Sequence, residues 1–172
     1  MTDKVKVMIS EEQVTKRIQE LAEQISKDYE GKSVHLICIL KGSIFFSCDL
    51  AKRITVPVTF DFMSVSSYGN ETVSSGRVRI LKDLDESIQG RNVLIVEDII
   101  DSGRTLSYLK DLLGGRAPES LDICTLLDKP DRRETEVYVK YVGFEIPDEF
   151  VVGYGLDYNQ YYRNLPYVGV IE

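Results

Sequence analysis

Three short and mostly apolar runs constrain the fold of this chain more than any other feature. They cover residues 34–40, 92–96 and 120–127, and each has the length of a strand rather than of a helix. A strand that is apolar at consecutive positions must be covered on both faces, which is typical of parallel sheets packed between helices. The chain is therefore predicted to fold as an α/β protein.

Segments with helical or strand character alternate with these runs. Ser10 and Gln13 have the spacing of a helix capping box. The apolar positions that follow recur at helical spacing: Val14, Ile18, Leu21 and Ile25. Further helices are predicted over residues 44–53 and 104–113, and further strands over residues 56–63, 78–81, 141–146 and 150–154. This alternation predicts one domain, residues 1–172, with a mostly parallel sheet and right-handed crossovers.

Composition excludes several classes of protein. The chain has 28 acidic and 21 basic residues, a net charge of −7, which favours solubility and argues against an extended grip on nucleic acid. Cys38, Cys48 and Cys124 are odd in number and lack CxxC spacing, so reduced thiols are predicted rather than disulfides or a zinc site. Neither a signal peptide nor the roughly 20 apolar residues of a membrane span is recognisable, and a cytoplasmic location is predicted.

The segment VLIVEDIIDSGRT, residues 93–105, carries the strongest functional signal. A buried strand leads to Glu97 and Asp98, whose carboxylates suit sugar hydroxyls or a hydrated magnesium ion. A turn then opens a helix, where free backbone N–H groups and the helix dipole favour a phosphate. The turn contributes an acid, hydroxyls, a glycine and a positive charge: Asp101, Ser102, Gly103, Arg104 and Thr105. A site for a phosphorylated ribose is predicted.

Residues 93–105 resemble the phosphoribosyl-pyrophosphate motif of the type I phosphoribosyltransferases: an apolar run, two acids, two apolar residues and D-[ST]-G-x-T. The resemblance implies that family's fold, a mostly parallel twisted sheet flanked by helices, with a small hood formed by about residues 129–172 and a mobile lid loop at about residues 64–76. It implies that residues 101–105 bind the 5-phosphate and that Glu97 and Asp98 bind ribose or metal. An ordinary strand, turn and helix with an acidic N-cap is the plainer alternative.

Two more stretches are similar to the hypoxanthine-guanine branch of this family. Residues 40–43, LKGS, resemble its pyrophosphate loop, with Lys41 and Gly42 as pyrophosphate ligands and a 40–41 peptide that is often cis in the family. Ser67 and Tyr68 resemble the lid that folds over the donor. A lid suits this chemistry, because the ribosyl centre must be shielded from water.

The C-terminal part of the chain supplies the residues that resemble the purine site. Lys129 matches a lysine that contacts the purine 6-oxygen, a group that accepts from an ammonium whereas an amino group would not. Phe150 would stack on the purine and the Val151 backbone would read its edge, while Asp157 would hold magnesium and Arg163 would meet pyrophosphate. Taken alone, a lysine after a strand is usually a solvated charge, and a phenylalanine is usually core.

The resemblance implies a magnesium-dependent glycosyltransferase (pentosyltransferase) of purine salvage that binds nucleotides. It would move the 5-phosphoribosyl group from 5-phosphoribosyl-1-pyrophosphate to N9 of hypoxanthine, and of guanine, giving IMP or GMP. Asp101 is the candidate general acid or base, since the matching residue faces purine N7. Members of the family are commonly dimers or tetramers, and residues 41–46 are predicted at an interface. His35, inside an apolar strand, is predicted to be structural.

Three alternatives remain open at the level of sequence. A regulator of the same fold that binds RNA should carry a basic face, whereas this chain is acidic. A synthase of the phosphoribosyl donor would need a nucleotide-binding segment and a longer chain. A transferase that prefers xanthine or guanine would differ only around the purine 2-position, which the sequence does not resolve.

Overall fold

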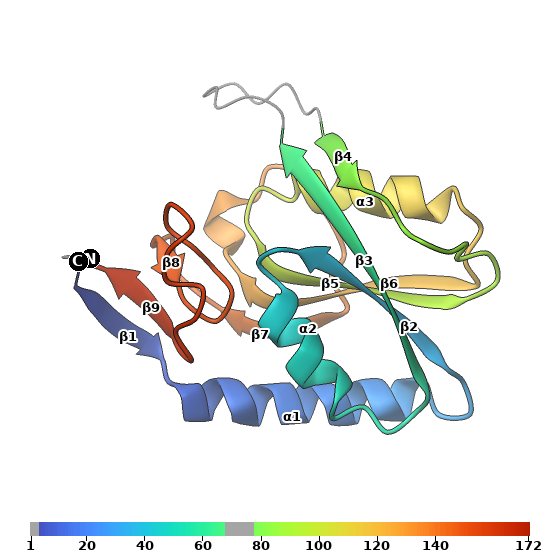
Figure 1. Cartoon of the computed structure of the whole chain (residues 1–172), viewed down its shortest axis with the longest axis horizontal. Coiled ribbons are helices and arrows are strands. Elements are labelled where there is room, and N and C mark those ends of the chain that lie inside the picture. Colours follow the sequence, from blue (N-terminus) through green and yellow to red (C-terminus); the bar gives the residue numbers. More distant parts are fainter. Residues whose placement is uncertain (1–3, 68–77) are drawn as a thin grey trace.

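A six-stranded sheet forms the centre of the molecule (Figure 1). The computed structural model describes residues 4–67 and 78–172. The strands of the sheet are β2 (Val34–Leu40), β3 (Val58–Ser67), β4 (Val78–Lys82), β5 (Asn92–Ile100), β6 (Ser120–Asp128) and β7 (Tyr141–Glu145). Their order is β4-β3-β2-β5-β6-β7, and neighbours are parallel except for β3 and β4. The predicted fold class is confirmed.

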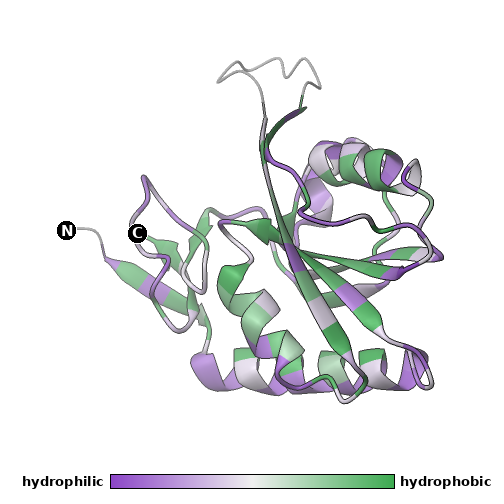
Figure 2. Ribbon diagram, turned by 45° about the vertical axis from the view of Figure 1, so that its right-hand side comes forward, coloured by the Kyte–Doolittle hydropathy of each residue, from purple (hydrophilic) through white to green (hydrophobic). Residues whose placement is uncertain are grey.

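Helices cover both faces of this sheet, which explains its apolar runs. Helices α1 (Glu11–Asp28) and α2 (Ile44–Ala51) pack on one face and α3 (Arg104–Gly114) packs on the other. Successive strand residues point to opposite faces, so Leu36 joins the core under α1 and α2 whereas Ile37 joins the core under α3. Figure 2 shows the resulting concentration of hydrophobic residues on the central strands.

The first helix begins at the predicted capping box. The Ser10 hydroxyl accepts from the Gln13 backbone N–H at 3.2 Å, and the Gln13 side chain accepts from the Ser10 N–H at 2.9 Å. The Arg17 guanidinium then donates from Nε to Gly143 O at 2.8 Å and from Nη2 to Val142 O at 2.7 Å. These bonds attach α1 to β7, far along the chain.

A second, smaller antiparallel sheet contains β1 (Val5–Ile9), β9 (Val168–Ile171) and β8 (Val151–Val152), in the order β1-β9-β8. The C-terminal segment alone was expected to form the hood, and neither β1 nor β9 was predicted. The hood sheet includes the N-terminal strand, because Val5 pairs with Ile171, whereas β7 belongs to the main sheet. A pairing between the two ends of a chain leaves no local signal in the sequence.

Other element boundaries differ from those predicted. The predicted loop 64–76 starts inside β3, because Ser66 pairs with Arg79 and Ser67 with Val78 across the β3–β4 ladder. The predicted strand 150–154 is a strand only over Val151–Val152. No helix within the described residues is long and apolar enough to cross a membrane. All three cysteines are free; Cys38 and Cys124 are buried and Cys48 is exposed.

Candidate active site

The carboxyl ends of three neighbouring strands bring the predicted site residues to one edge of the sheet. Lys41 directly follows β2, Asp101 directly follows β5, and Lys129 directly follows β6. The chain leaves β2 toward β3 on one side, and β5 lies on the other side of β2, so the order of the strands reverses here. Open α/β sheets bind ligands at such a point, outside the carboxyl ends of the strands.

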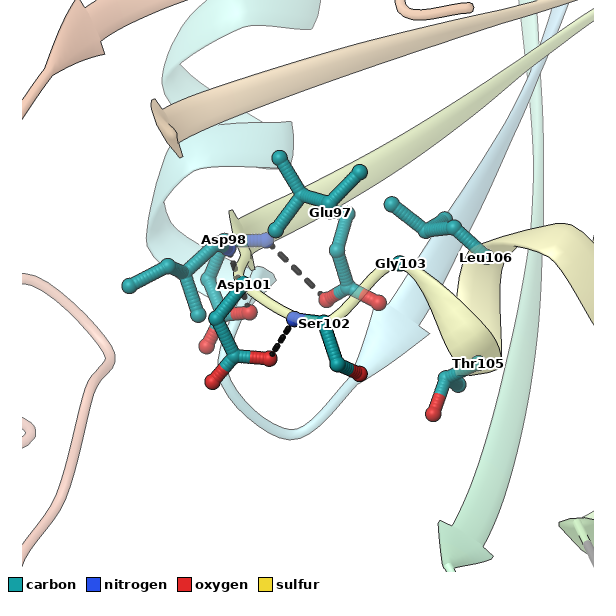
Figure 3. Close-up of a pocket in the computed structure, with 9 residues that line it drawn as sticks. Glu97, Asp98, Asp101, Ser102, Gly103, Thr105 and Leu106 are labelled. Carbon is teal, nitrogen blue, oxygen red and sulfur yellow. Dashed lines mark hydrogen bonds between the residues drawn. The ribbon is translucent and has the colours of Figure 1, made fainter. Parts of the chain in front are cut away.

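The turn between β5 and α3, residues 101–105, forms a cradle whose geometry suits an anion (Figure 3). The Asp101, Ser102 and Thr105 side chains project from the same side of the turn and line a cavity with Gly103. The Ser102 backbone N–H donates to the Asp101 carboxylate, and the Ser102 hydroxyl accepts from Arg104 N–H at 3.3 Å. The cavity lies at the N-terminus of α3, where the helix dipole favours an anion.

The backbone conformation and the packing at position 103 require a glycine, for a reason that the sequence did not predict. Its φ of 83° lies in the left-handed region, and a Cβ at this position would lie 2.4 Å from Thr135 O. The glycine therefore lets the cradle pack against residues 133–135. The Glu134 and Thr135 N–H groups both donate to Ser102 O, at 2.9 and 3.0 Å.

Arg133 is a site residue that the sequence analysis missed. Its Nε donates to Asp101 O at 3.0 Å, and its Nη2 pairs with the Asp128 carboxylate at the end of β6. One guanidinium thus connects the cradle to the residue before Lys129. Nothing in the local pattern distinguishes Arg133 from its neighbour Arg132, so no sequence signal could have found it.

Two adjacent carboxylates stand behind the cradle. Glu97 is 9% exposed, and its Oε1 accepts from Asp98 N–H at 3.0 Å. Burial, followed by repulsion from Asp98, raises the pKa of Glu97 well above its ordinary value, and burial raises the pKa of Asp98. Sugar hydroxyls or a hydrated cation at this position would stabilise the charged forms.

The pyrophosphate loop predicted at residues 40–43 packs tightly against this acidic pair. The peptide between Leu40 and Lys41 is cis, as the resemblance led us to expect. A Cβ on Gly42 would lie 1.9 Å from Asp98 Oδ2, so only a glycine allows this approach. The loop also packs closely against Gly155, which was not among the predicted site residues. A Cβ on Gly155 would lie 2.1 Å from Gly42 O.

A second cavity, of about 500 Å³, adjoins the cradle and shares Asp98 and Asp101 with it. This volume is within the range of small-molecule sites. Lys129 lines the cavity and is 9% exposed, so its ammonium is not the solvated surface charge of the alternative interpretation. Phe150 also lines it and is 56% exposed, not core; its ring meets Tyr158 edge-on at 5.7 Å.

Arg163 and Asp157 form an ion pair beside this cavity. Arg163 Nη2 lies 3.3 Å from Asp157 Oδ1, and Arg163 Nη1 donates to Gly155 O at 2.6 Å. Asp157 lines the cavity with the buried Val151, the first residue of β8. The structure therefore gathers the predicted purine, metal and pyrophosphate residues at one place.

The other predicted residues lie around or away from this place. The Arg104 guanidinium pairs with Glu134, beside the cradle. Ser67 ends β3, and Tyr68 lies outside the described residues. His35 lies near the amino end of β2, 3% exposed, with Nδ1 2.7 Å from Thr59 Oγ1, in keeping with a structural role.

Comparisons with known proteins agree with this geometry. Residues 8–159 match the family model described as phosphoribosyl transferase domain. The hypoxanthine phosphoribosyltransferase of Salmonella typhimurium is 56% identical over 173 residues, covering 99% of this chain and 97% of the relative. The crystal structure of a hypoxanthine-guanine phosphoribosyltransferase from Bacillus anthracis has 51% sequence identity and superposes with a TM-score of 0.95, covering 98% of this chain and 100% of that one.

Some relatives carry the same domain within a longer protein. The bifunctional protein TilS/HprT of Listeria monocytogenes is 54% identical over 97% of this chain, and the chain spans only 26% of that relative. The domain therefore occurs both as nearly the whole of a relative and as a part of one.

Proposed function

This chain belongs to the phosphoribosyltransferase family, within which its relatives are hypoxanthine-guanine phosphoribosyltransferases, and on that premise we propose its reaction and the roles of its residues. It transfers the 5-phosphoribosyl group of 5-phosphoribosyl-1-pyrophosphate to N9 of hypoxanthine or guanine and releases pyrophosphate. The observation that carries the proposal is the convergence of Lys41, Asp101 and Lys129 at the carboxyl ends of β2, β5 and β6.

The cradle at residues 101–105 holds the 5-phosphate of the donor. Backbone N–H groups at the start of α3 and the Ser102 and Thr105 hydroxyls donate to its oxygens. The carboxylates of Glu97 and Asp98 accept from the ribose hydroxyls. Since the two acids and the cradle line one cavity, a single phosphorylated ribose spans both.

The adjoining cavity holds the purine. Phe150 offers an exposed ring for stacking, and the Lys129 ammonium donates to the 6-oxygen. A buried lysine favours a 6-oxo group over a 6-amino group, because an amino group would leave two donors facing each other. Val151, at the wall of the cavity, contributes backbone groups to the purine edge.

Asp101 handles the proton of the reaction. It lines both cavities, so its carboxylate lies between the ribose site and the base site. There it accepts the N7 or N9 proton as the new bond forms at N9, and returns a proton in the reverse reaction. Positive charge develops at the ribose C1, and the Asp98 and Glu97 carboxylates lie on the ribose side to stabilise it.

Lys41, Gly42 and Arg163 receive the pyrophosphate group. Magnesium fits this part of the site, because the donors are carboxylates: Asp157 beside Arg163, and the pair Glu97 and Asp98, whose pKa values are raised by burial and whose charged forms a cation would stabilise. No group of three or more His, Cys, Asp or Glu in the described residues could hold a metal, and Mg²⁺ typically uses one or two carboxylates together with substrate phosphates. When bound, Mg²⁺ neutralises charge on the leaving pyrophosphate.

The remaining features follow from the same proposal. The chain acts as a single domain in the cytoplasm. It assembles as a dimer or tetramer through the surface around residues 41–46, where Phe45 is 42% exposed. Neither nucleic acid nor membrane is a partner.

The test is formation of nucleotide and pyrophosphate from 5-phosphoribosyl-1-pyrophosphate and Mg²⁺ with hypoxanthine, guanine, xanthine or adenine. Asp101→Asn should lower kcat by about 100-fold or more, and Asp111→Asn, the same change on the exposed side of α3, should leave it unaltered. Lys129→Met should raise the KM of hypoxanthine about tenfold or more. Turnover with adenine alone, or full activity of Asp101→Asn, would contradict the proposal.

A further inference from the structure

A tight turn at residues 158–161 points one side chain toward the pyrophosphate-binding cations. Tyr158 N–H donates to Tyr161 O at 3.0 Å and Tyr161 N–H donates to Tyr158 O at 2.9 Å, which closes a two-residue hairpin turn. The central residues Asn159 and Gln160 have φ of 52° and 70°. Positive φ at both central positions is the mark of a type I′ turn, whose backbone directs the Gln160 side chain.

The Gln160 amide oxygen accepts from two cationic side chains. Lys41 Nζ lies 3.2 Å from Oε1, and Arg163 Nη2 lies 3.4 Å from the same oxygen. Lys41 comes from the loop after β2, so this oxygen bridges the main sheet and the hood. Gln160 is itself held by Asp157, whose Oδ2 accepts from Gln160 N–H at 2.8 Å.

The shared amide oxygen keeps two cationic side chains close together when no anion is bound between them. Two cationic side chains that share one acceptor atom lie close together and repel each other. Arg163 is also held by Asp157 and by Gly155 O, whereas the Lys41 ammonium, among the described residues, is held by Gln160 and would otherwise extend into solvent. A carboxylate in this position would hold them, but it would also cancel the charge that attracts pyrophosphate. A neutral amide oxygen holds both cations and leaves their charge unchanged.

We propose that Gln160 is a positioning residue, which holds Lys41 and Arg163 in the free protein at the separation that the pyrophosphate group needs. The inference rests on the proposed function, since it assumes that these two cations meet pyrophosphate. A phosphate oxygen takes the place of the amide oxygen on binding, so that the cations are ordered before the ligand arrives. Gln160 does not touch the reacting atoms.

The experiment measures the affinity of inorganic pyrophosphate, with Mg²⁺ in excess, by calorimetry. The variants are Gln160→Ala, which removes the amide; Gln160→Asn, which keeps it but cannot reach; and Gln160→Glu, which keeps the length and adds a charge. The matched control is Asn159→Ala, in the same turn. Each variant is also assayed for the KM values of donor and hypoxanthine, and for Tm.

Gln160→Ala and Gln160→Asn should weaken pyrophosphate binding about tenfold, the effect expected when side chains must be ordered anew on binding. The KM of the donor should rise, while the KM of hypoxanthine and Tm stay close to the wild-type values. Gln160→Glu should weaken binding at least as much, and the difference from wild type should shrink as salt rises, because the added charge is screened. Asn159→Ala should bind pyrophosphate like the wild type.

Pyrophosphate affinities within about twofold of wild type for Gln160→Ala and Gln160→Asn would overturn this inference, as would equal losses for Asn159→Ala. Those results leave the proposed reaction intact if Lys41→Ala still weakens pyrophosphate binding. If Lys41→Ala binds pyrophosphate like the wild type, the assignment of the pyrophosphate site fails, and the inference fails with it.

Discussion

Replacement of Gly155 by alanine should disable the active site without removing any functional group. A Cβ at this position would lie 2.1 Å from the carbonyl oxygen of Gly42, which is backbone and cannot rotate away. Ordinary contact begins at 3.4 Å, so the pyrophosphate loop or the hood must move by roughly 1 Å, a displacement that can lower a rate about 100-fold. Gly42 cannot yield toward the sheet, because the Asp98 carboxylate lies directly behind it.

The matched control is Gly31→Ala. Gly31 has φ of 78°, close to the left-handed conformation of Gly155 at 99°, but nothing lies within 4 Å of a Cβ there. Both variants should lose about 1–2 kcal/mol of stability from the positive φ alone. We expect kcat/KM to fall about 100-fold in Gly155→Ala and to stay within about twofold of wild type in Gly31→Ala. Equal activities of the two variants at equal Tm would show that the contact with Gly42 does not position the loop.

Three further outcomes are expected. Arg133→Lys should lower kcat about tenfold at nearly constant Tm, because a lysine cannot bond both Asp101 O and the Asp128 carboxylate. Steady-state kinetics measures this kcat, and a value equal to that of the wild type would refute the role of Arg133. Burial, followed by the positive charge of Arg91, lowers the pKa of His35 below 6.5. The unfolded chain therefore binds a proton at this histidine more tightly than the folded protein does, and the free energy of unfolding falls as pH drops below about 6.5. Thermal melts of His35→Gln should lose this slope, and an unchanged slope would refute the assignment to the chain's one histidine. Leu109→Ala, in the core under α3, should cost about 2–5 kcal/mol in urea unfolding, and a cost below about 1 kcal/mol would contradict the packing.

The local sequence predicted those parts of the site that one strand, one turn and one helix build together. Asp101 and Gly103 lie where the 93–105 pattern puts them, between the end of β5 and the start of α3. The capping box at Ser10 and Gln13 is likewise present. Each of these features depends on groups only a few residues apart, so its physical chemistry is contained in a short stretch of chain.

Contacts between distant segments could not be predicted in this way. Gly155 meets Gly42, and Gln160 meets Lys41, across more than a hundred residues of sequence. Such contacts depend on how the hood packs against the sheet, and neighbouring sequence carries no record of that packing.

The sequence by itself thus determined the fold class, because apolar periodicity decides which faces are buried, and it determined the phosphate turn, because a helix start provides its own donors. Only the tertiary structure decided that a buried Lys129 and an exposed Phe150 line one cavity, that Arg133 donates to Asp101 O, and that the N-terminal strand β1 completes the hood sheet. The physical reason is one of range. Local rules act over a turn or two of chain, whereas the separations that make a site are set by side chains that meet only after the sheets have packed.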